Sequence, residues 1–127
     1  MVEGLLKTIM EQAYPELTWS INNYEDADHT GTVYLESGDP PSSYEDGLRF
    51  PHYMLWVRSS DFDLAERVTI NSIDLLNKRR EITYTNKRGE EYYIYFVESI
   101  GEANRIGRNG DIMEWSSNFK VTLRRVI

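Results

Sequence analysis

The strongest constraint on the fold lies near the end of the sequence, where apolar and polar side chains alternate over residues 113–123. The apolar positions are Met113, Trp115, Phe119, Val121 and Leu123, and the intervening side chains are mostly polar. Successive side chains of a β-strand point to opposite faces, so this segment predicts a strand with one dry face and one wet face. Strands of that kind belong to antiparallel sheets, whose dry face needs a covering layer.

Two amphipathic helices can supply that layer. Apolar side chains recur at three- and four-residue intervals over residues 2–13, and Pro15 ends the pattern. A second helix is expected after Ser59 or Ser60, either of which would be its N-cap. Ile70 falls on the polar side of this second helix, which makes it a candidate partner contact.

The remaining apolar runs predict five more strands, at residues 17–21, 32–36, 52–58, 81–85 and 92–99. The run at 52–58 is apolar on nearly both faces and predicts a central strand. Trp56 and Trp115 are expected in the core. Residues 22–31, 37–50 and 99–110 are expected to be long loops. The order predicts one α+β domain over residues 1–127, a mostly antiparallel sheet with two helices packed on one face.

Composition narrows the class of function. The chain has 127 residues, a net charge of −7 and no cysteine. It therefore lacks thiolate chemistry, and the absence of cysteine suits a protein made in a reducing compartment. An acidic chain does not favour a general phosphate-binding surface. No apolar run approaches the roughly 18 residues that span a bilayer, so we expect no membrane association.

Catalytic and metal motifs give no assignment. His29 and His52 are the only histidines, and no Gly-x-Ser-x-Gly sequence marks a nucleophile. The acidic run that includes Asp26 and Asp28 lacks the twelfth-position carboxylate of a calcium loop. We therefore predict a non-enzymatic protein and assign no catalytic, cofactor-binding or metal-binding residue.

Three segments together resemble a known family. They are "TVYLESGDPP", then "RFPHYMLWVRSSDFDLAERVTINSIDLL", and finally "SIGEANRIGRNGDIMEWSSNFKVTL". The order of these segments and their residue patterns, from Gly31 to Leu123, resemble those of the small tail terminator proteins of long-tailed bacteriophages. These proteins are often labelled minor capsid or tail-completion proteins.

The resemblance implies an oligomeric assembly component. In that family an α+β protomer assembles into a six-fold ring that caps the tail tube, stops its polymerisation and provides the head-joining surface. The implied partners are other copies of the chain in a hexamer, the tail-tube protein and the head-connector or stopper protein. DNA would pass through without specific binding. The implied location is the head–tail junction of the virion, after synthesis in the bacterial host cytoplasm.

Candidate contact residues follow from the expected loops and from the exposed side of the second helix. The candidate partner interface consists of Ile70, Asp39, Tyr44, Glu45, Asp46, Arg105 and Arg108. Glu25, Asp26 and Asp28 are candidates for an acidic lumen wall, since like charge keeps DNA from sticking.

Two other classes of function stay open at this point. An acidic interaction module, such as an immunity-type inhibitor or an adaptor, would bind one basic partner without forming a ring. A small enzyme built on carboxylates would need a deep pocket with convergent polar groups and shifted pKa values. Native mass and genome neighbours would distinguish these classes.

Overall fold

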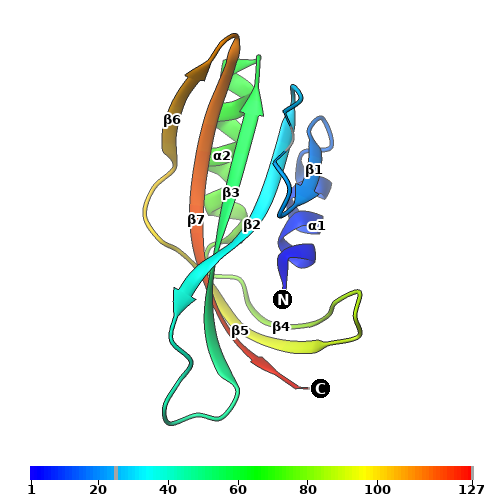
Figure 1. Ribbon diagram of the computed structural model, residues 1–127, viewed down its shortest axis with the longest axis vertical. Coiled ribbons are helices and arrows are strands. Elements are labelled where there is room, and N and C mark those ends of the chain that lie inside the picture. The colour runs from blue at the N-terminus through cyan, green and yellow to red at the C-terminus, as the bar shows by residue number, and fades with distance from the viewer. Residues whose placement is uncertain (25, 127) are drawn as a thin grey trace.

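The structure is a computed structural model that describes residues 1–24 and 26–126 (Figure 1). Over these residues the chain forms two helices and seven strands. Their bounds are α1 (Glu3–Ala13), β1 (Thr18–Ile21), β2 (Thr30–Asp39), β3 (Leu48–Ser59), α2 (Phe62–Leu76), β4 (Arg80–Thr85), β5 (Glu91–Ser99), β6 (Asn104–Asn109) and β7 (Ile112–Arg125). The α+β class predicted from the sequence is confirmed.

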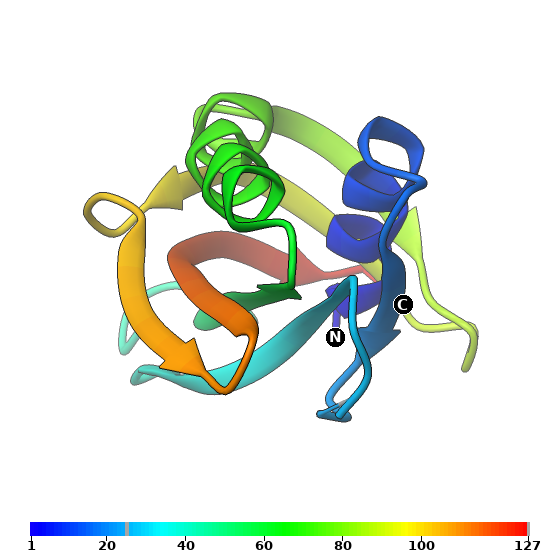
Figure 2. The ribbon, with the colours of Figure 1, turned by 90° about the horizontal axis from the view of Figure 1, so that it is seen from above.

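All seven strands belong to one curled sheet (Figure 2). Six of them follow the order β1-β2-β3-β7-β5-β4, and β6 pairs with β7 outside this order. Only β1 and β2 pair in parallel; the other pairs among the described strands are antiparallel. The long strand β7 pairs with β3 on one side. On its other side it pairs first with β6 and then with β5. This arrangement places β3 and β7 at the centre of the sheet, as the apolar run at 52–58 predicted.

The core lies between the sheet and the two helices. Helix α2 packs on β3, β5 and β7, and α1 packs on β1 and β2. The buried apolar residues of β3 and β7 are the alternate ones facing the helices, among them Tyr53, Leu55, Val57, Phe119, Val121 and Leu123. Leu6, Met10, Leu64 and Val68 meet them from the helices. Burial of these side chains removes apolar surface from water and is the main stabilising contribution of the fold.

One buried hydroxyl ties the start of α1 to the sheet. Tyr53 is fully buried, and its hydroxyl oxygen accepts a hydrogen bond from the backbone N–H of Val2 at 3.2 Å. Burial raises the pKa of Tyr53 well above its usual range. This hydrogen bond satisfies one of the N–H groups that the first turn of a helix leaves unpaired.

The predicted loop at 99–110 is wrong over half its length, because residues 104–109 form β6. This strand pairs with Ile112–Ser116 of β7 through a tight turn at Gly110, where φ is 65°. A register shift between Arg105 and Gly107 interrupts the pairing, and φ at Gly107 is 133°. A strand with such a bulge loses the regular alternation on which its prediction depends.

The predicted loop at 37–50 is also too long. Strand β2 continues to Asp39 and β3 begins at Leu48, so only residues 40–47 connect them. Pro51 lies within β3, opposite a register shift between Glu36 and Asp39. A strand tolerates proline at such an irregularity because a ladder hydrogen bond is already missing there. Gly38 also fits this site, since a Cβ would come within 2.4 Å of the Phe50 carbonyl oxygen.

Two side-chain expectations need correction. The N-cap of α2 is Asp61, whose carboxylate accepts the Leu64 N–H at 3.2 Å, and not Ser59 or Ser60. Trp56 is half-buried and faces away from the core, because the core-facing residues of β3 are the odd-numbered ones. Trp115 does face the core, but it is only partly buried.

Candidate interaction surfaces

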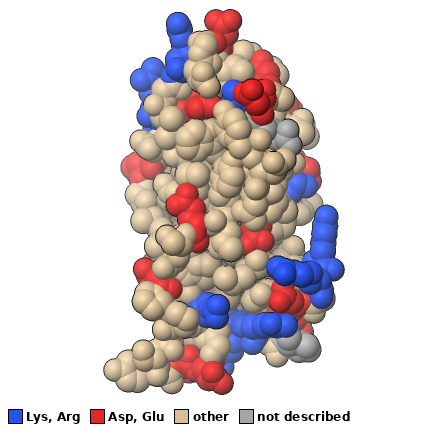
Figure 3. All heavy atoms as spheres, viewed as in Figure 1, with Lys and Arg blue, Asp and Glu red and all other residues tan. Residues whose placement is uncertain are grey.

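The first candidate surface is the face of the sheet opposite the helices, which we call the open face. It consists of Thr32, Tyr34, Met54, Trp56, Ser116 and Asn118, which lie in register across β2, β3 and β7. Thr32 and Ser116 are buried on either side of Trp56, and the other members are half-buried. Figure 3 looks onto this face, whose middle carries few charged side chains. Tyr34, Met54 and Trp56 are its apolar members, and each keeps part of its side chain accessible to solvent.

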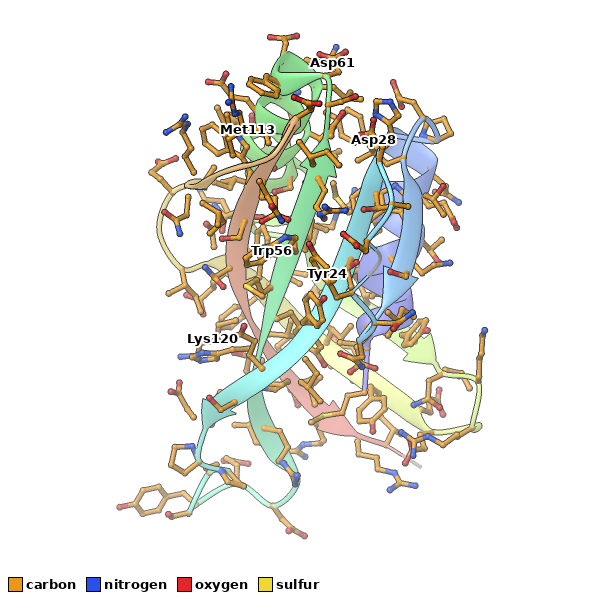
Figure 4. The ribbon with its side chains drawn as sticks, turned by 45° about the horizontal axis from the view of Figure 1, so that its top comes forward. Tyr24, Asp28, Trp56, Asp61, Met113 and Lys120 are labelled. Carbon is orange, nitrogen blue, oxygen red and sulfur yellow. The ribbon has the colours of Figure 1, made fainter. Side chains whose placement is uncertain are left out.

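Trp56 is at the centre of the open face (Figure 4). Its indole Nε1 is buried and has no hydrogen-bond acceptor among the described residues. A buried N–H group without an acceptor is costly, and buried indole groups usually have a partner.

The loop between β1 and β2 covers residues 22–29, because β2 begins at Thr30 and shortens the predicted loop at 22–31. An ion pair at the upper end of the open face fixes this 22–29 loop. The Arg58 guanidinium is 3% exposed, and its Nε lies 2.7 Å from Oε1 of Glu114. The Tyr24 hydroxyl donates to the same carboxylate oxygen at 2.9 Å, and the Tyr24 ring lies 5.1 Å from the guanidinium carbon. Arg58 also donates to the carbonyl of Ala27 at 2.7 Å. One buried cation thus joins β3, β7 and the loop.

A second set of contacts ties the same loop to the start of α2. The Asp28 carboxylate accepts the Ser60 backbone N–H at 2.7 Å and the Ser60 hydroxyl at 2.5 Å. The hydrogen bond from the Ser60 hydroxyl is the main cause of the lowered pKa of Asp28. His29 Nδ1 lies 2.8 Å from the Ser59 hydroxyl oxygen. The two serines expected to cap the helix bind the loop instead.

Of the three acidic residues expected at a lumen wall, Asp26 and Asp28 have different surroundings. The Asp26 side chain is 88% exposed, with a 3.4 Å contact to Arg58, and its charge faces water. Asp28 is held by Ser60 and is less exposed. Glu25 lies outside the described residues.

The predicted interface residues of the 37–50 segment have different surroundings. Asp39 ends β2 and lies 3.3 Å from Lys120 Nζ and 3.6 Å from His52 Nε2. Tyr44 is 98% exposed in the 40–47 connection. Its neighbour Glu45 pairs with Arg124 at 3.2 Å, and Asp46 is exposed.

The remaining predicted contact residues lie far from that connection along the chain. Arg105 and Arg108 are both exposed on β6, so they belong to a strand and not to the expected loop. Ile70 is 43% exposed on α2, as its position on the polar side predicted. The structure therefore does not gather the predicted residues into one patch.

Within residues 1–24 and 26–126, no group of three or more histidine and carboxylate side chains could hold a metal ion. Neither helix there has the length and apolar character needed to cross a bilayer.

Sequence reasoning missed the joint roles of Tyr24, Arg58 and Glu114. One signal was present, since an arginine inside an otherwise apolar central strand needs a buried anionic partner. The identity of that partner depends on strand register, which places Glu114 opposite Arg58. No protein-family model and no curated protein matches the sequence.

Proposed function

We propose that the chain is a tail terminator protein of a long-tailed bacteriophage. Copies of it form a ring that caps the tail tube, ends tube polymerisation and provides the surface for head joining. The proposal is based on the resemblance over residues 31–123, and the open face is the structural observation that supports it best. A sheet covered by helices on one face only, with Met54 and Trp56 half-buried on the other, has a surface suited to assembly.

Connections at both ends of the long axis support a role between two partners. The start of α2 and the turn between β6 and β7 lie at one end, and the 40–47 connection lies at the other (Figure 1). In a ring with its axis along this direction, one end would face the tail-tube protein and the other the head-connector protein. The rigid attachment of the 22–29 loop through Arg58 and Asp28 suits a docking element.

The acidic character of the chain also fits a channel that DNA traverses. The net charge is −7, and the exposed carboxylate of Asp26 is one of the groups that could line a lumen. Carboxylates repel the phosphate backbone, so DNA passes without binding.

Electron microscopy of lysates tests this function directly. A phage that lacks the gene should produce DNA-filled heads beside overlong or unjoined tails, because nothing ends the tube or joins it to the head. A phage complemented with the intact gene is the control. Normal tails joined to heads in the deletion lysate would exclude the proposal and favour the acidic interaction module.

Ile70 provides a test of the ring. Replacement by Asp should change the free energy of unfolding by no more than about 0.5 kcal/mol, because the side chain is 43% exposed. Association should weaken by about 2 kcal/mol or more if Ile70 lies in an apolar subunit contact. Light scattering over a concentration series measures association, and denaturant unfolding measures stability. Glu66→Gln, at an exposed position on the same helix, is the control.

A further inference from the structure

The 40–47 connection is an ordered projection, which we call the arm. The Ser42 hydroxyl oxygen accepts the backbone N–H groups of Tyr44 at 3.2 Å and Glu45 at 3.0 Å. The Ser42 N–H donates to the Leu48 carbonyl at 3.1 Å and closes the base of the arm. Tyr44 is 98% exposed on this turn. An exposed aromatic side chain on a preorganised turn loses little conformational entropy when it binds a partner.

The arm is acidic. Residues 40–47 contain Glu45 and Asp46 and no lysine or arginine. Glu45 contacts Arg124 at 3.2 Å, and Asp46 is in no ion pair with a described residue. A surface that binds this arm should therefore be basic and should have room for an aromatic ring.

A hollow with these properties lies at the same end of the molecule. It has a volume of about 420 Å³ and is lined by Arg49, Arg88 and Arg125 together with Glu90 and Tyr92. Glu90 lies 3.6 Å from Arg88 and 3.5 Å from Arg125, and Arg49 adds a further guanidinium group, so the lining is basic. Figure 3 shows the lysine and arginine side chains gathered at the lower right, whereas the arm projects at the lower left of Figure 1. We call this site the basic hollow.

The arm of the same chain does not fill the basic hollow with its tip. Gly47, at the arm's base, lines the hollow, but Tyr44 is almost fully in water. The exposed Tyr44 and Asp46 of the arm and the basic lining of the hollow are thus complementary surfaces. Arginine forms bidentate hydrogen bonds with carboxylates and stacks on aromatic rings, so it suits both the carboxylates and the tyrosine of the arm.

We propose that the arm of one copy docks in the basic hollow of the next copy. Two different surfaces meet in such a contact, so it is a head-to-tail contact, and repeated head-to-tail contacts close into a ring when the rotation permits. The significance of the contact for a ring rests on the proposed function. The contact itself can be tested on the purified chain.

Complementary variants test the docking. The arm variant combines Tyr44→Ser with Asp46→Asn, and the hollow variant combines Arg49→Glu with Arg88→Glu. Each should associate about tenfold or more weakly than the original chain when mass is measured from micromolar to millimolar concentration. Lys78→Glu with Arg80→Glu makes the same charge change as the hollow variant at two exposed positions outside the hollow and should leave association unchanged.

A mixture of the two variants gives the sharpest result. The arm variant keeps its hollow and the hollow variant keeps its arm, so the mixture should form a dimer of one copy of each and nothing larger. Circular dichroism spectra matching that of the original chain confirm that both variants are folded. Absence of this dimer, or undiminished association of either variant alone, would overturn the docking.

The outcomes also separate this inference from the proposed function. If the original chain forms a ring that both variants retain, the ring uses another contact and only the docking is wrong. If the original chain stays monomeric up to millimolar concentration, the docking is again wrong, whereas the deletion lysate still decides the function.

Discussion

Glu114→Leu is expected to lower the free energy of unfolding by about 3–5 kcal/mol, the usual cost of removing one partner of a buried ion pair. The Arg58 guanidinium is 3% exposed, and its shortest carboxylate contact, 2.7 Å, is to Glu114. The substitution leaves a buried cation without that carboxylate and removes the acceptor of the Tyr24 hydroxyl. Denaturant unfolding followed by tryptophan fluorescence measures the loss.

The double variant Arg58→Met with Glu114→Leu is the matched control. Apolar side chains of similar volume often replace a buried ion pair at little cost, so this variant should recover most of the lost stability. The 22–29 loop should nevertheless be cleaved faster by protease, since Arg58 no longer holds the Ala27 carbonyl. A Glu114→Leu protein as stable as the original would show that water solvates the Arg58 cation in solution.

The regular elements were predictable where local pattern and burial agree. Helix α1 and strand β7 follow the apolar periodicity of the sequence closely. The turn between β4 and β5 has Gly89 at a positive φ of 82°, a conformation that glycine adopts readily. In α1 and β7 most apolar side chains face the core and most polar side chains face away from it, so the sequence pattern reflects the environment.

Irregular strands were not predictable in the same way. Strand β6 has a bulge near Gly107, and β3 contains Pro51 beside another irregularity. Glycine and proline are normally signs of loops, and only the paired strand shows that here they mark bulges. Both errors made the predicted loops longer than the loops in the structure.

The candidate surfaces depend on long-range register, which periodicity does not contain. The basic hollow brings Arg49, Arg88 and Arg125 together from three distant segments. Arg58 meets Glu114 only because β3 and β7 are neighbours. The sequence did identify Tyr44, Glu45 and Asp46 as contact candidates, because long connections with exposed aromatic and charged residues often bind partners.

Strand β3 also shows why the Trp56 prediction was wrong. Residues 52–58 are apolar at nearly every position, so their pattern does not indicate which face the helices cover. The helices cover Tyr53, Leu55 and Val57, and Trp56 is left on the open face. The size of a side chain does not decide its face when both faces of a strand are apolar.

Phe119→Ala tests this assignment of faces and should lower the free energy of unfolding by about 3–5 kcal/mol. Phe119 is fully buried on β7, in register with Tyr53 of β3 and Ser99 of β5. Truncation removes the ring and leaves a cavity at the centre of the core. Because a domain of this kind has only about 5–15 kcal/mol of stability, the variant should unfold at a much lower denaturant concentration.

Trp56→Ala is the comparison that gives this prediction its meaning. The Trp56 side chain is half-buried on the open face. A smaller fraction of its apolar surface is shielded from water than for Phe119, and its truncation leaves no enclosed cavity. We therefore expect Trp56→Ala to lower the free energy of unfolding less than Phe119→Ala does, although tryptophan is the larger side chain. Trp56→Ala should also weaken self-association if the open face is an assembly surface. Equal losses for the two variants would mean that the open face is as well packed as the helix-covered core, and it would then be an unsuitable surface for a partner.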